Sequence, residues 1–326
     1  MTGITELENI YILPQNFKYI NKYYECMFLN KNKELLTIQR PINIIKEIIQ
    51  NNINSDIQNI NNKTININYK CIYIGGLMEH YGHFLIETLA RFWIFLNNNA
   101  NKININDFKI IISRGQMSSK DFKKNQNSDL FNYICNCFNI DKQNIIYLDN
   151  DPLYVKKLYI PEKYIYLNTR KYNILHKEVF DKIINYTLSI NKQNVEKYDK
   201  IFVYRGLKDN RIDLNIENKL VEIFKKYNFK IINPSKKTFT NDILSYNNCK
   251  IIAGVEGTNI HNILFCKKNT ILIGIASNRR SHFDANQSNC NHITQSKNYW
   301  IKKEMYKDLS IFEEKLKSIL LENNLL

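Results

Sequence analysis

From residue 198 onward, short apolar segments alternate with amphipathic segments, and this order limits the possible folds more than any other feature. Strands are expected at 200–205, 229–234, 250–254 and 270–276, with helices at 215–228, 239–248 and 258–265. Such a series predicts a mostly parallel sheet with helices on both faces. In sheets of this kind, ligands bind beyond the carboxyl ends of the strands.

The preceding residues are less regular but also favour an α/β fold. Strands are expected at 70–75, 108–113, 144–148 and 155–161, and helices at Tyr81–Asn97, Asp129–Phe138 and His176–Ile190. We therefore predict two Rossmann-like domains, residues 1–194 and residues 195–326. The first includes an N-terminal extension of about 65 residues that the pattern does not assign. Whether the apolar face of a final helix at 307–324 packs back on the first domain is left open.

Charge alone does not indicate the function of the chain. The 46 basic residues exceed the 31 acidic ones and give a net charge of +15. Eight of the basic residues are arginines, and the lysines are scattered along the chain instead of forming blocks. A scattered excess is typical of solvated faces, so no nucleic-acid partner is predicted. A non-catalytic protein that binds polyanions through its lysines remains the alternative.

The cysteines and the apolar segments indicate the compartment. The seven cysteines show no paired spacing, which predicts reduced thiols and no zinc site or disulfide framework. The N-terminal residues lack the pattern of a signal peptide, and the apolar run at 92–96 is too short to span a membrane. We expect a soluble, cytoplasmic protein without a transmembrane segment. Peripheral attachment to a membrane and the oligomeric state are left open.

Glycine is scarce in this chain, so its positions are informative. Six of the nine glycines fall in three short stretches: Gly75, Gly76, Gly82, Gly206, Gly254 and Gly257. The last two lie in "IIAGVEGTNIHNILF", where a predicted strand leads into a predicted helix. Small residues there allow an anion such as a diphosphate to reach the amides at Gly257 and Thr258. Glu256 would then accept a hydroxyl of the ligand, whereas a tight turn with Glu256 as a helix cap is the structural alternative.

Other polar residues accompany this turn. His261 and Asn262 follow on the predicted helix and are either ligand-binding residues or hydrogen-bonded core residues. Arg205 and Arg211 follow the first strand of the same domain. Arginine presents a fixed fork of N–H donors that matches phosphate oxygens. Two arginines so close together in a lysine-rich chain favour a phosphate site over an incidental surface turn.

The segment "GGLMEHYGHFLIETLARFWIF" carries a second polar cluster. His83, Glu87 and Arg91 are four residues apart and should form one stripe along an otherwise apolar helix. The helix dipole is expected to lower the pKa of His83 and keep the imidazole neutral, so that it can act as a base. A purely structural ladder of His83, Glu87 and Arg91 is the alternative.

These two regions resemble glycosyltransferase family 61, in its bacterial-type branch. "GHFLIETLARFWIF" is similar to the family's histidine-containing helix, and residues 200–275 resemble its signature block of arginines and glycine-rich turn. Thr258 and Asn259 stand where the family has Ser and Ala, and Asp242 stands where Gln is expected. Eukaryotic relatives carry His at the position of Glu256.

The resemblance implies a GT-B arrangement, with two facing Rossmann-like domains and a cleft between them. It implies a nucleotide-sugar donor, expected to be UDP-linked, on the C-terminal domain, and inversion at the anomeric carbon without a structural metal. No cofactor is expected. The acceptor would be a hydroxyl of a glycan or glycoprotein, as in polysaccharide biosynthesis, with His83 as the base and Glu87 orienting it. Arg205, Arg211, Glu256, Gly257, Thr258, His261 and Asn262 are the candidate donor-binding residues.

One motif points elsewhere. "YLDNDP" places Asp149 and Asp151 after an apolar strand, as in metal-binding Asp-x-Asp motifs of another glycosyltransferase fold. Pro152 follows at once and a new strand is expected by Val155. We therefore interpret this segment as a turn rich in Asp and Asn, and predict no metal site.

Overall fold

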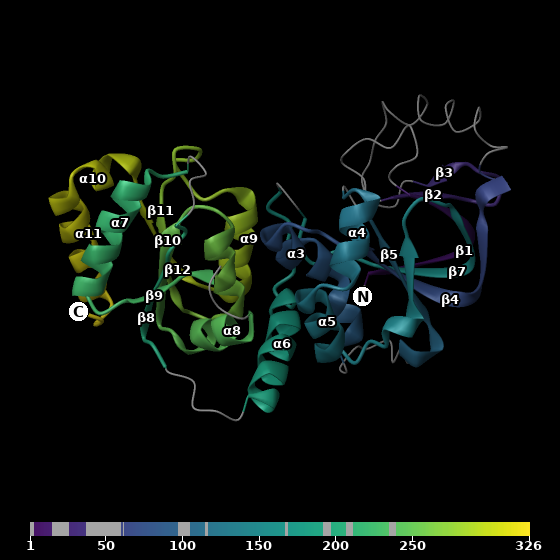
Figure 1. Cartoon of the computed structure of the whole chain (residues 1–326), viewed down its shortest axis with the longest axis horizontal. Coiled ribbons are helices and arrows are strands. Elements are labelled where there is room, and N and C mark those ends of the chain that lie inside the picture. Colours follow the sequence, from purple (N-terminus) through teal and green to yellow (C-terminus); the bar gives the residue numbers. More distant parts are fainter. Residues whose placement is uncertain are drawn as a thin grey trace. The chain divides into compact units, whose positions relative to one another are not determined.

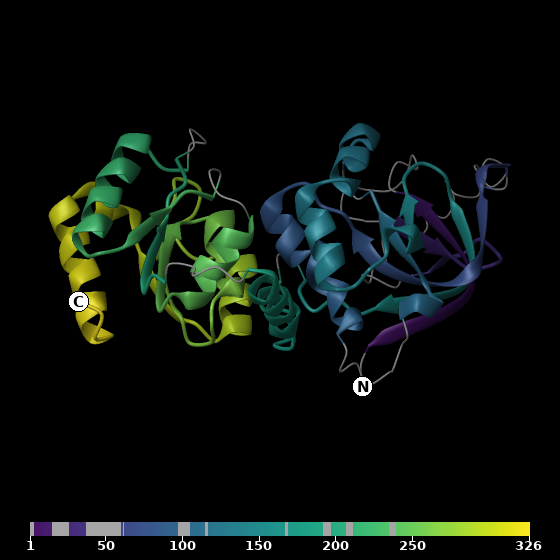
Figure 2. The same cartoon turned by 60° about the horizontal axis from the view of Figure 1, so that its bottom comes forward.

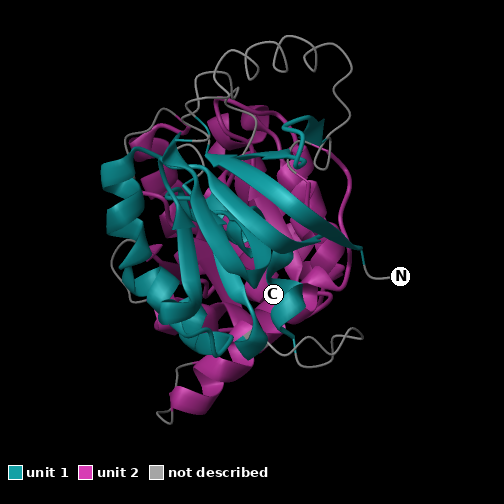
Figure 3. Cartoon of the chain, turned by 90° about the vertical axis from the view of Figure 1, so that its right-hand side faces the viewer, with its two compact units in different colours: residues 1–163 teal, residues 164–326 magenta. Residues whose placement is uncertain are grey.

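The computed structural model describes residues 3–14, 26–36, 60, 62–96, 105–114, 117–166, 169–191, 197–206, 211–234 and 239–326. It divides into two compact units, Met1–Lys163 (unit 1) and Tyr164–Leu326 (unit 2), which are coloured separately in Figure 3. Each unit contains one sheet with accompanying helices (Figure 1). The predicted mixed α/β class is therefore confirmed for both units.

Unit 2 contains a parallel sheet of five strands in the order β12-β11-β10-β8-β9. The strands are β8 (Lys200–Val203), β9 (Lys230–Ile232), β10 (Ile251–Val255), β11 (Ile271–Ile275) and β12 (Lys297–Ile301). Four of them coincide with the predicted strands, and β12 was not predicted. Every residue of β10 and β11 is buried, as expected for central strands covered on both faces.

Helices cover both faces of this sheet. They are α6 (His176–Ile190), α7 (Leu214–Lys226), α8 (Phe239–Asn248), the 3₁₀ helix η5 (Thr258–Phe265), α9 (Ala285–Thr294), α10 (Lys303–Lys307) and α11 (Leu309–Glu322). Helices α7 and α11 lie on one face, and α8 and α9 lie on the other (Figures 1 and 2). The predicted helix at 258–265 is therefore present, but as a 3₁₀ helix.

Aromatic packing fixes the outer helices of unit 2. Phe202 of β8 stacks on Phe224 of α7 at 4.3 Å, and Phe224 meets Phe312 of α11 edge-on at 5.8 Å. All three side chains belong to one buried cluster. The apolar face of the final helix α11 therefore packs within the core of unit 2.

The division between the units falls about 30 residues before the boundary predicted at 194/195. Helix α6 accounts for the difference because it packs against α8, η5 and α9. Phe180 of α6, for example, meets Phe265 of η5 edge-on at 5.1 Å. The sequence assigned this helix to the first domain because it precedes the first strand of the parallel sheet.

Unit 1 contains a mixed sheet of seven strands in the order β3-β2-β1-β7-β4-β5-β6. They are β1 (Ile4–Pro14), β2 (Cys26–Leu29), β3 (Leu35–Leu36), β4 (Ile65–Gly76), β5 (Lys109–Ser113), β6 (Ile145–Leu148) and β7 (Leu153–Pro161). Strands β7, β4, β5 and β6 are parallel, while β1 is antiparallel to β2 and β7. The described part of the N-terminal extension therefore supplies the antiparallel half of the sheet.

The helices of unit 1 are short. They are α3 (Tyr81–Ile86), η1 (Thr88–Phe95), η2 (Ile105–Asp107), α4 (Ser119–Gln126), α5 (Asp129–Cys137) and η3 (Lys142–Asn144). The single helix predicted at 81–97 is thus divided into α3 and the 3₁₀ helix η1, and Asn97 lies outside the described residues. The Thr88 hydroxyl donates to Gly76 O at 2.9 Å and so connects the start of η1 to the end of β4.

Candidate functional site

Polar residues gather at the carboxyl edge of the sheet in unit 2. Strands β8, β10 and β11 are parallel neighbours, so their carboxyl ends share one edge. The segments that follow them carry Arg205, then Glu256 and Gly257, and then Ser277 and Arg280. The sequence predicted the first three of these residues at this edge and missed the last two.

The guanidinium groups of Arg205 and Arg211 flank Gly257. A Cβ atom built on Gly257 would lie 2.7 Å from Arg211 Nη1 and 3.0 Å from Arg205 Nη1. The φ angle of Gly257 is 130°, a backbone conformation that residues with a side chain rarely adopt. Glycine is therefore needed twice here, for the backbone conformation and for the space that the two guanidinium groups occupy. This geometry brings Arg205 and Arg211 together, as the sequence predicted.

Glu256 is the buried centre of the site, with 3% of its surface exposed. Its Oε2 accepts a hydrogen bond from Arg211 Nη1 at 2.9 Å and another from Ser277 Oγ at 2.8 Å. Its Oε1 accepts one from Arg280 Nη1 at 3.1 Å. Both carboxylate oxygens are thus engaged by side chains of the protein. That Glu256 accepts a ligand hydroxyl stays a prediction.

The surroundings of Glu256 favour its charged form. Burial opposes ionisation of the carboxyl group, but the Ser277 hydrogen bond and the charges of Arg211 and Arg280 outweigh this effect. The pKa of Glu256 consequently lies below its ordinary value. A buried carboxylate held between two arginines fixes the positions of both guanidinium groups.

Glu217 supports the site from helix α7. Its side chain is 1% exposed and accepts hydrogen bonds from the backbone N–H groups of Arg205, at 2.8 Å, and Gly206, at 3.0 Å. Gly206 has a φ angle of 61°, so the chain turns sharply directly after Arg205. Glu217 therefore fixes the backbone from which the Arg205 side chain projects.

His261 and Asn262 contact neighbouring parts of unit 2. His261 is 8% exposed, and its Nδ1 lies 2.7 Å from Gln287 Oε1 of α9. Asn262 is 1% exposed and donates to Asn259 O at 3.0 Å. These contacts agree with the alternative that both are hydrogen-bonded core residues. Thr258 is half-buried at the first position of η5, directly after Gly257.

The predicted pair of His83 and Glu87 is present in unit 1. His83 Nδ1 contacts Glu87 Oε1, and 48% of the His83 side chain is exposed, against 13% for Glu87. Arg91, in contrast, is buried and donates from Nε to Pro161 O at 2.8 Å. Its guanidinium also lies over the Tyr73 ring, 5.6 Å from the centroid. The change of helix type after Ile86 separates the pair from Arg91, so the continuous helical stripe that we predicted is wrong.

The predicted direction of the His83 pKa shift is also wrong. The hydrogen bond to Glu87 raises the pKa of His83 above its ordinary value, and the nearby carboxylate charge acts in the same direction against partial burial. Helix α3 has six residues, so its dipole is weak beside a carboxylate in direct contact. Contact with Glu87 identifies Nδ1 as the N–H donor of a neutral imidazole, which leaves Nε2 as the basic nitrogen.

Asp149 and Asp151 lie in the turn between β6 and β7, as the sequence predicted. Asp149 accepts a hydrogen bond from Ser119 Oγ at 2.6 Å and pairs with Arg114 Nη1 at 3.3 Å. Among the residues that the structure describes, no group of three or more His, Cys, Asp and Glu side chains could hold a metal ion. The absence of a metal requirement nevertheless stays a prediction.

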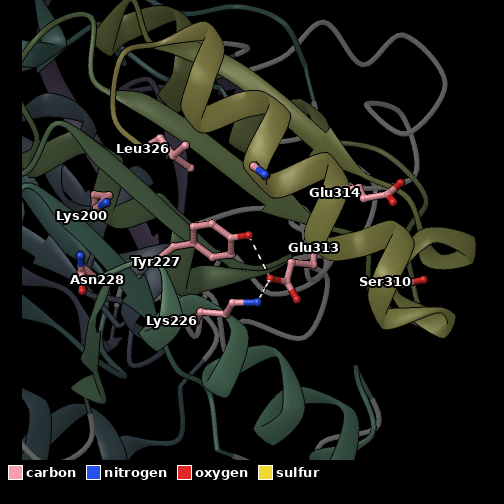
Figure 4. A pocket seen from close by; sticks show the side chains of 9 residues that line it. Lys200, Lys226, Tyr227, Asn228, Ser310, Glu313, Glu314 and Leu326 are labelled. Atoms are coloured by element: carbon pink, nitrogen blue, oxygen red, sulfur yellow. Dashed lines mark hydrogen bonds and ion pairs between the residues drawn. The ribbon is translucent and has the colours of Figure 1, made fainter.

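A groove of about 620 Å³ lies at the opposite edge of the unit 2 sheet (Figure 4). It includes Lys200, the first residue of β8, and Asn228, which lies before β9, so it opens at the amino ends of the strands. Tyr227 OH donates to Glu313 Oε1 at 2.9 Å across it, and Lys226 contacts the same oxygen. The groove contains none of the predicted site residues.

The described part of the chain contains no helix that is long and apolar enough to cross a bilayer.

One family model matches the part of the chain that contains both polar regions. The model of the family described as Glycosyltransferase 61 matches residues 81–273, which is more than half of the chain. The match includes His83 and Glu87 in unit 1, and Arg205, Arg211 and Gly257 in unit 2. No curated protein matches the chain. The chain therefore belongs to glycosyltransferase family 61.

Proposed function

We propose that this glycosyltransferase is an inverting enzyme that uses a nucleoside-diphosphate sugar and binds its diphosphate at the carboxyl edge of the unit 2 sheet. The acceptor is a hydroxyl group of a glycan or a protein. Membership of the family supports sugar transfer. The donor class, the stereochemistry and the acceptor belong to the proposal.

The position of Arg205 and Arg211 around Gly257 carries this proposal. Their Nη1 atoms lie within about 3 Å of the same point in space, the position of the absent Cβ atom. Two guanidinium groups held this close repel each other, and an anion between them would remove that repulsion. Gly257 also precedes η5, whose first residues have no side-chain cap. Backbone N–H groups and two arginine forks suit the oxygens of a diphosphate.

These groups have a clear task in an inverting transfer. The acceptor oxygen attacks the anomeric carbon from the face opposite the diphosphate, and a new carbon–oxygen bond forms as the bond to the diphosphate oxygen breaks. The electron pair of the broken bond stays on the leaving diphosphate. Arg205 and Arg211 stabilise this growing negative charge more strongly than the charge of the bound donor, which lowers the barrier.

His83 is the proposed base that removes the acceptor proton. Glu87 holds Nδ1 and orients the imidazole, so that Nε2 can accept the proton from the attacking hydroxyl. The raised pKa of His83 makes it a stronger base but requires a pH at which the imidazole is neutral. Glu87 also stabilises the imidazolium that forms in the transition state.

The proposal includes the GT-B arrangement that we expect from the sequence, with the donor and acceptor sides facing each other across a cleft. It also includes a UDP-linked donor, a cytoplasmic location and a role in polysaccharide biosynthesis. Support for the donor side comes from the unit 2 geometry described above. Support for the acceptor side is the His83–Glu87 pair in unit 1.

The proposal can be tested by binding. Thermal-shift and calorimetric titrations of the full chain with UDP, GDP, CDP, ADP and dTDP should identify one tightly bound nucleotide. Its affinity should persist at high salt because arginine forks and backbone amides bind specifically. An affinity for all anions that collapses with salt would contradict the proposal and favour the alternative of a polyanion-binding protein.

A further inference from the structure

Resting on the proposed function, we propose that Arg280 is a third arginine that binds the donor diphosphate, and that Glu256 and Asp284 hold it in position. Arg280 follows β11, which lies directly beside β10 in the sheet. The segment after β11 therefore reaches the same edge as Glu256 and Gly257. The family match ends at residue 273 and does not include Arg280.

The Arg280 guanidinium is bonded to the protein through Nη1, whereas Nε and Nη2 are available to a ligand. Nη1 donates to Glu256 Oε1 at 3.1 Å and contacts Asp284 Oδ2, which uses both of its hydrogens. Within the described part of the chain, these are the contacts that the Arg280 side chain makes. Nε and Nη2 form the side-on pair that binds two oxygens of a phosphate. The side chain is 43% exposed, so a ligand can reach this pair.

Glu256 connects Arg280 to Arg211, one of the two arginines already described. Its two oxygens bind different guanidinium groups, Arg211 on Oε2 and Arg280 on Oε1. Arg280 is therefore held within reach of a ligand that contacts Arg211 beside Gly257. Three arginines against the two carboxylates of Glu256 and Asp284 leave one net positive charge for a diphosphate.

Hydrogen bonds fix the turn that carries Arg280. Ser277 Oγ accepts from the backbone N–H groups of Arg279, at 3.0 Å, and Arg280, at 3.2 Å, while it donates to Glu256. Asn278 N donates to Arg211 O at 2.6 Å. The turn is thus bonded both to the buried carboxylate and to the segment that carries Arg211. A solvated surface arginine would not need this support.

The following segment is anchored as well. The Phe283 ring packs over Gly274 and meets the Trp300 ring at 4.5 Å, where a side chain on residue 274 would collide with both rings. Asp284 Oδ1 accepts from Gln287 N at 2.7 Å and caps helix α9. The two carboxylate oxygens of Asp284 therefore have separate tasks, one on α9 and one on Arg280.

The test compares Arg280→Ala with Arg279→Ala by calorimetry, using the nucleoside diphosphate that the wild-type protein binds in the panel above. Both changes remove one positive charge from the same turn, but the ion pair with Glu256 belongs to Arg280. Arg280→Ala should weaken binding about 10- to 100-fold, the value of a hydrogen bond to a charged group. Arg279→Ala should change Kd less than about threefold, which is within the usual effect of a surface substitution.

A second variant separates ligand binding from support of the fold. Arg280→Lys keeps the charge beside Glu256 and Asp284 but lacks the fork, so we expect the wild-type melting temperature and roughly tenfold weaker binding. Wild-type affinity in Arg280→Lys, or equal affinities of the two alanine variants, would overturn the assignment of Arg280 while leaving the proposed function intact. If the wild-type protein binds no nucleoside diphosphate, the proposed function itself is contradicted, and the role of Arg280 with it.

Discussion

Arg211 Nη1 lies 2.9 Å from Glu256 Oε2, and the two side chains are 17% and 3% exposed. This ion pair joins the segment after β8 to the segment after β10. The Arg211 guanidinium also occupies the space that a side chain on residue 257 would need, so this ion pair requires glycine at position 257. The function that we propose depends on this arrangement.

Glu256→Gln should destabilise unit 2. The amide removes the charge that Arg211 and Arg280 share, and we expect the free energy of unfolding to fall by about 1–3 kcal/mol. Denaturant unfolding measures this change. Glu313→Gln is the matched control because Glu313 pairs with Lys226 at the surface, where the loss should stay below about 1 kcal/mol. Equal losses in the two variants would contradict a special role of the buried carboxylate.

The contribution of Glu256 should depend on pH in a defined direction. Its pKa is lower in the folded protein than in the unfolded chain, so the unfolded chain binds the proton more readily. The stabilisation is therefore complete above the ordinary pKa of 4.5 and is lost as the pH falls through the lower folded value. The difference in unfolding free energy between wild type and Glu256→Gln should shrink in that acid range. A difference that stays constant there would show that the Glu256 charge is not stabilised.

Transfer should continue in EDTA. Arg205, Arg211 and the amides at Gly257 are proposed to meet the charge of the diphosphate, so no divalent cation is required. The measurement is the turnover rate with and without the chelator. Complete loss that manganese restores would overturn this prediction and would direct attention to Asp149 and Asp151.

His83→Ala should lower the turnover rate by about 10² to 10⁴-fold, the usual effect of losing a positioned base. Binding of the nucleoside diphosphate, which we propose to involve residues of unit 2, should stay within a few-fold of wild type. In the wild-type enzyme, activity should fall as the pH falls through the raised pKa of His83, because the protonated imidazole cannot accept a proton. If the melting temperature drops while turnover hardly changes, His83 supports the fold, and its hydrogen-bond partner Glu87 becomes the next candidate base.

The sequence predicted the parallel sheet well because its central strands are continuously apolar and are separated by amphipathic helices. Knowing that β8 and β10 are parallel was sufficient to expect Arg205 and Gly257 at one edge. The antiparallel strands β1 to β3 were missed. Strand β1 joins the rest of the sheet through β7, which is distant in the sequence, and no local pattern encodes that pairing.

Arg280 and Glu217 were missed for different reasons. The proposed role of Arg280 depends on β11 lying beside β10, and strand order is not visible in a local pattern. A usable signal existed, since Arg279 and Arg280 are two of only eight arginines and follow a predicted strand. Glu217 acts on backbone N–H groups, so no partner side chain reveals its task. The pKa of His83 was misjudged because a direct hydrogen bond to Glu87 outweighs the dipole of a short helix.

The most direct test of the central claim is nucleotide binding by Arg205→Ala, measured by calorimetry against Arg170→Ala, which removes an exposed arginine elsewhere in unit 2. Arg205 Nη1 lies 3.0 Å from the position that a Cβ atom on Gly257 would occupy. Removing the Arg205 guanidinium should therefore weaken binding of the nucleoside diphosphate by about 1.5–3 kcal/mol. Arg170→Ala should bind as the wild-type protein does, and both variants should keep its melting temperature. Unchanged affinity in Arg205→Ala would show that the diphosphate does not bind at this edge of the sheet.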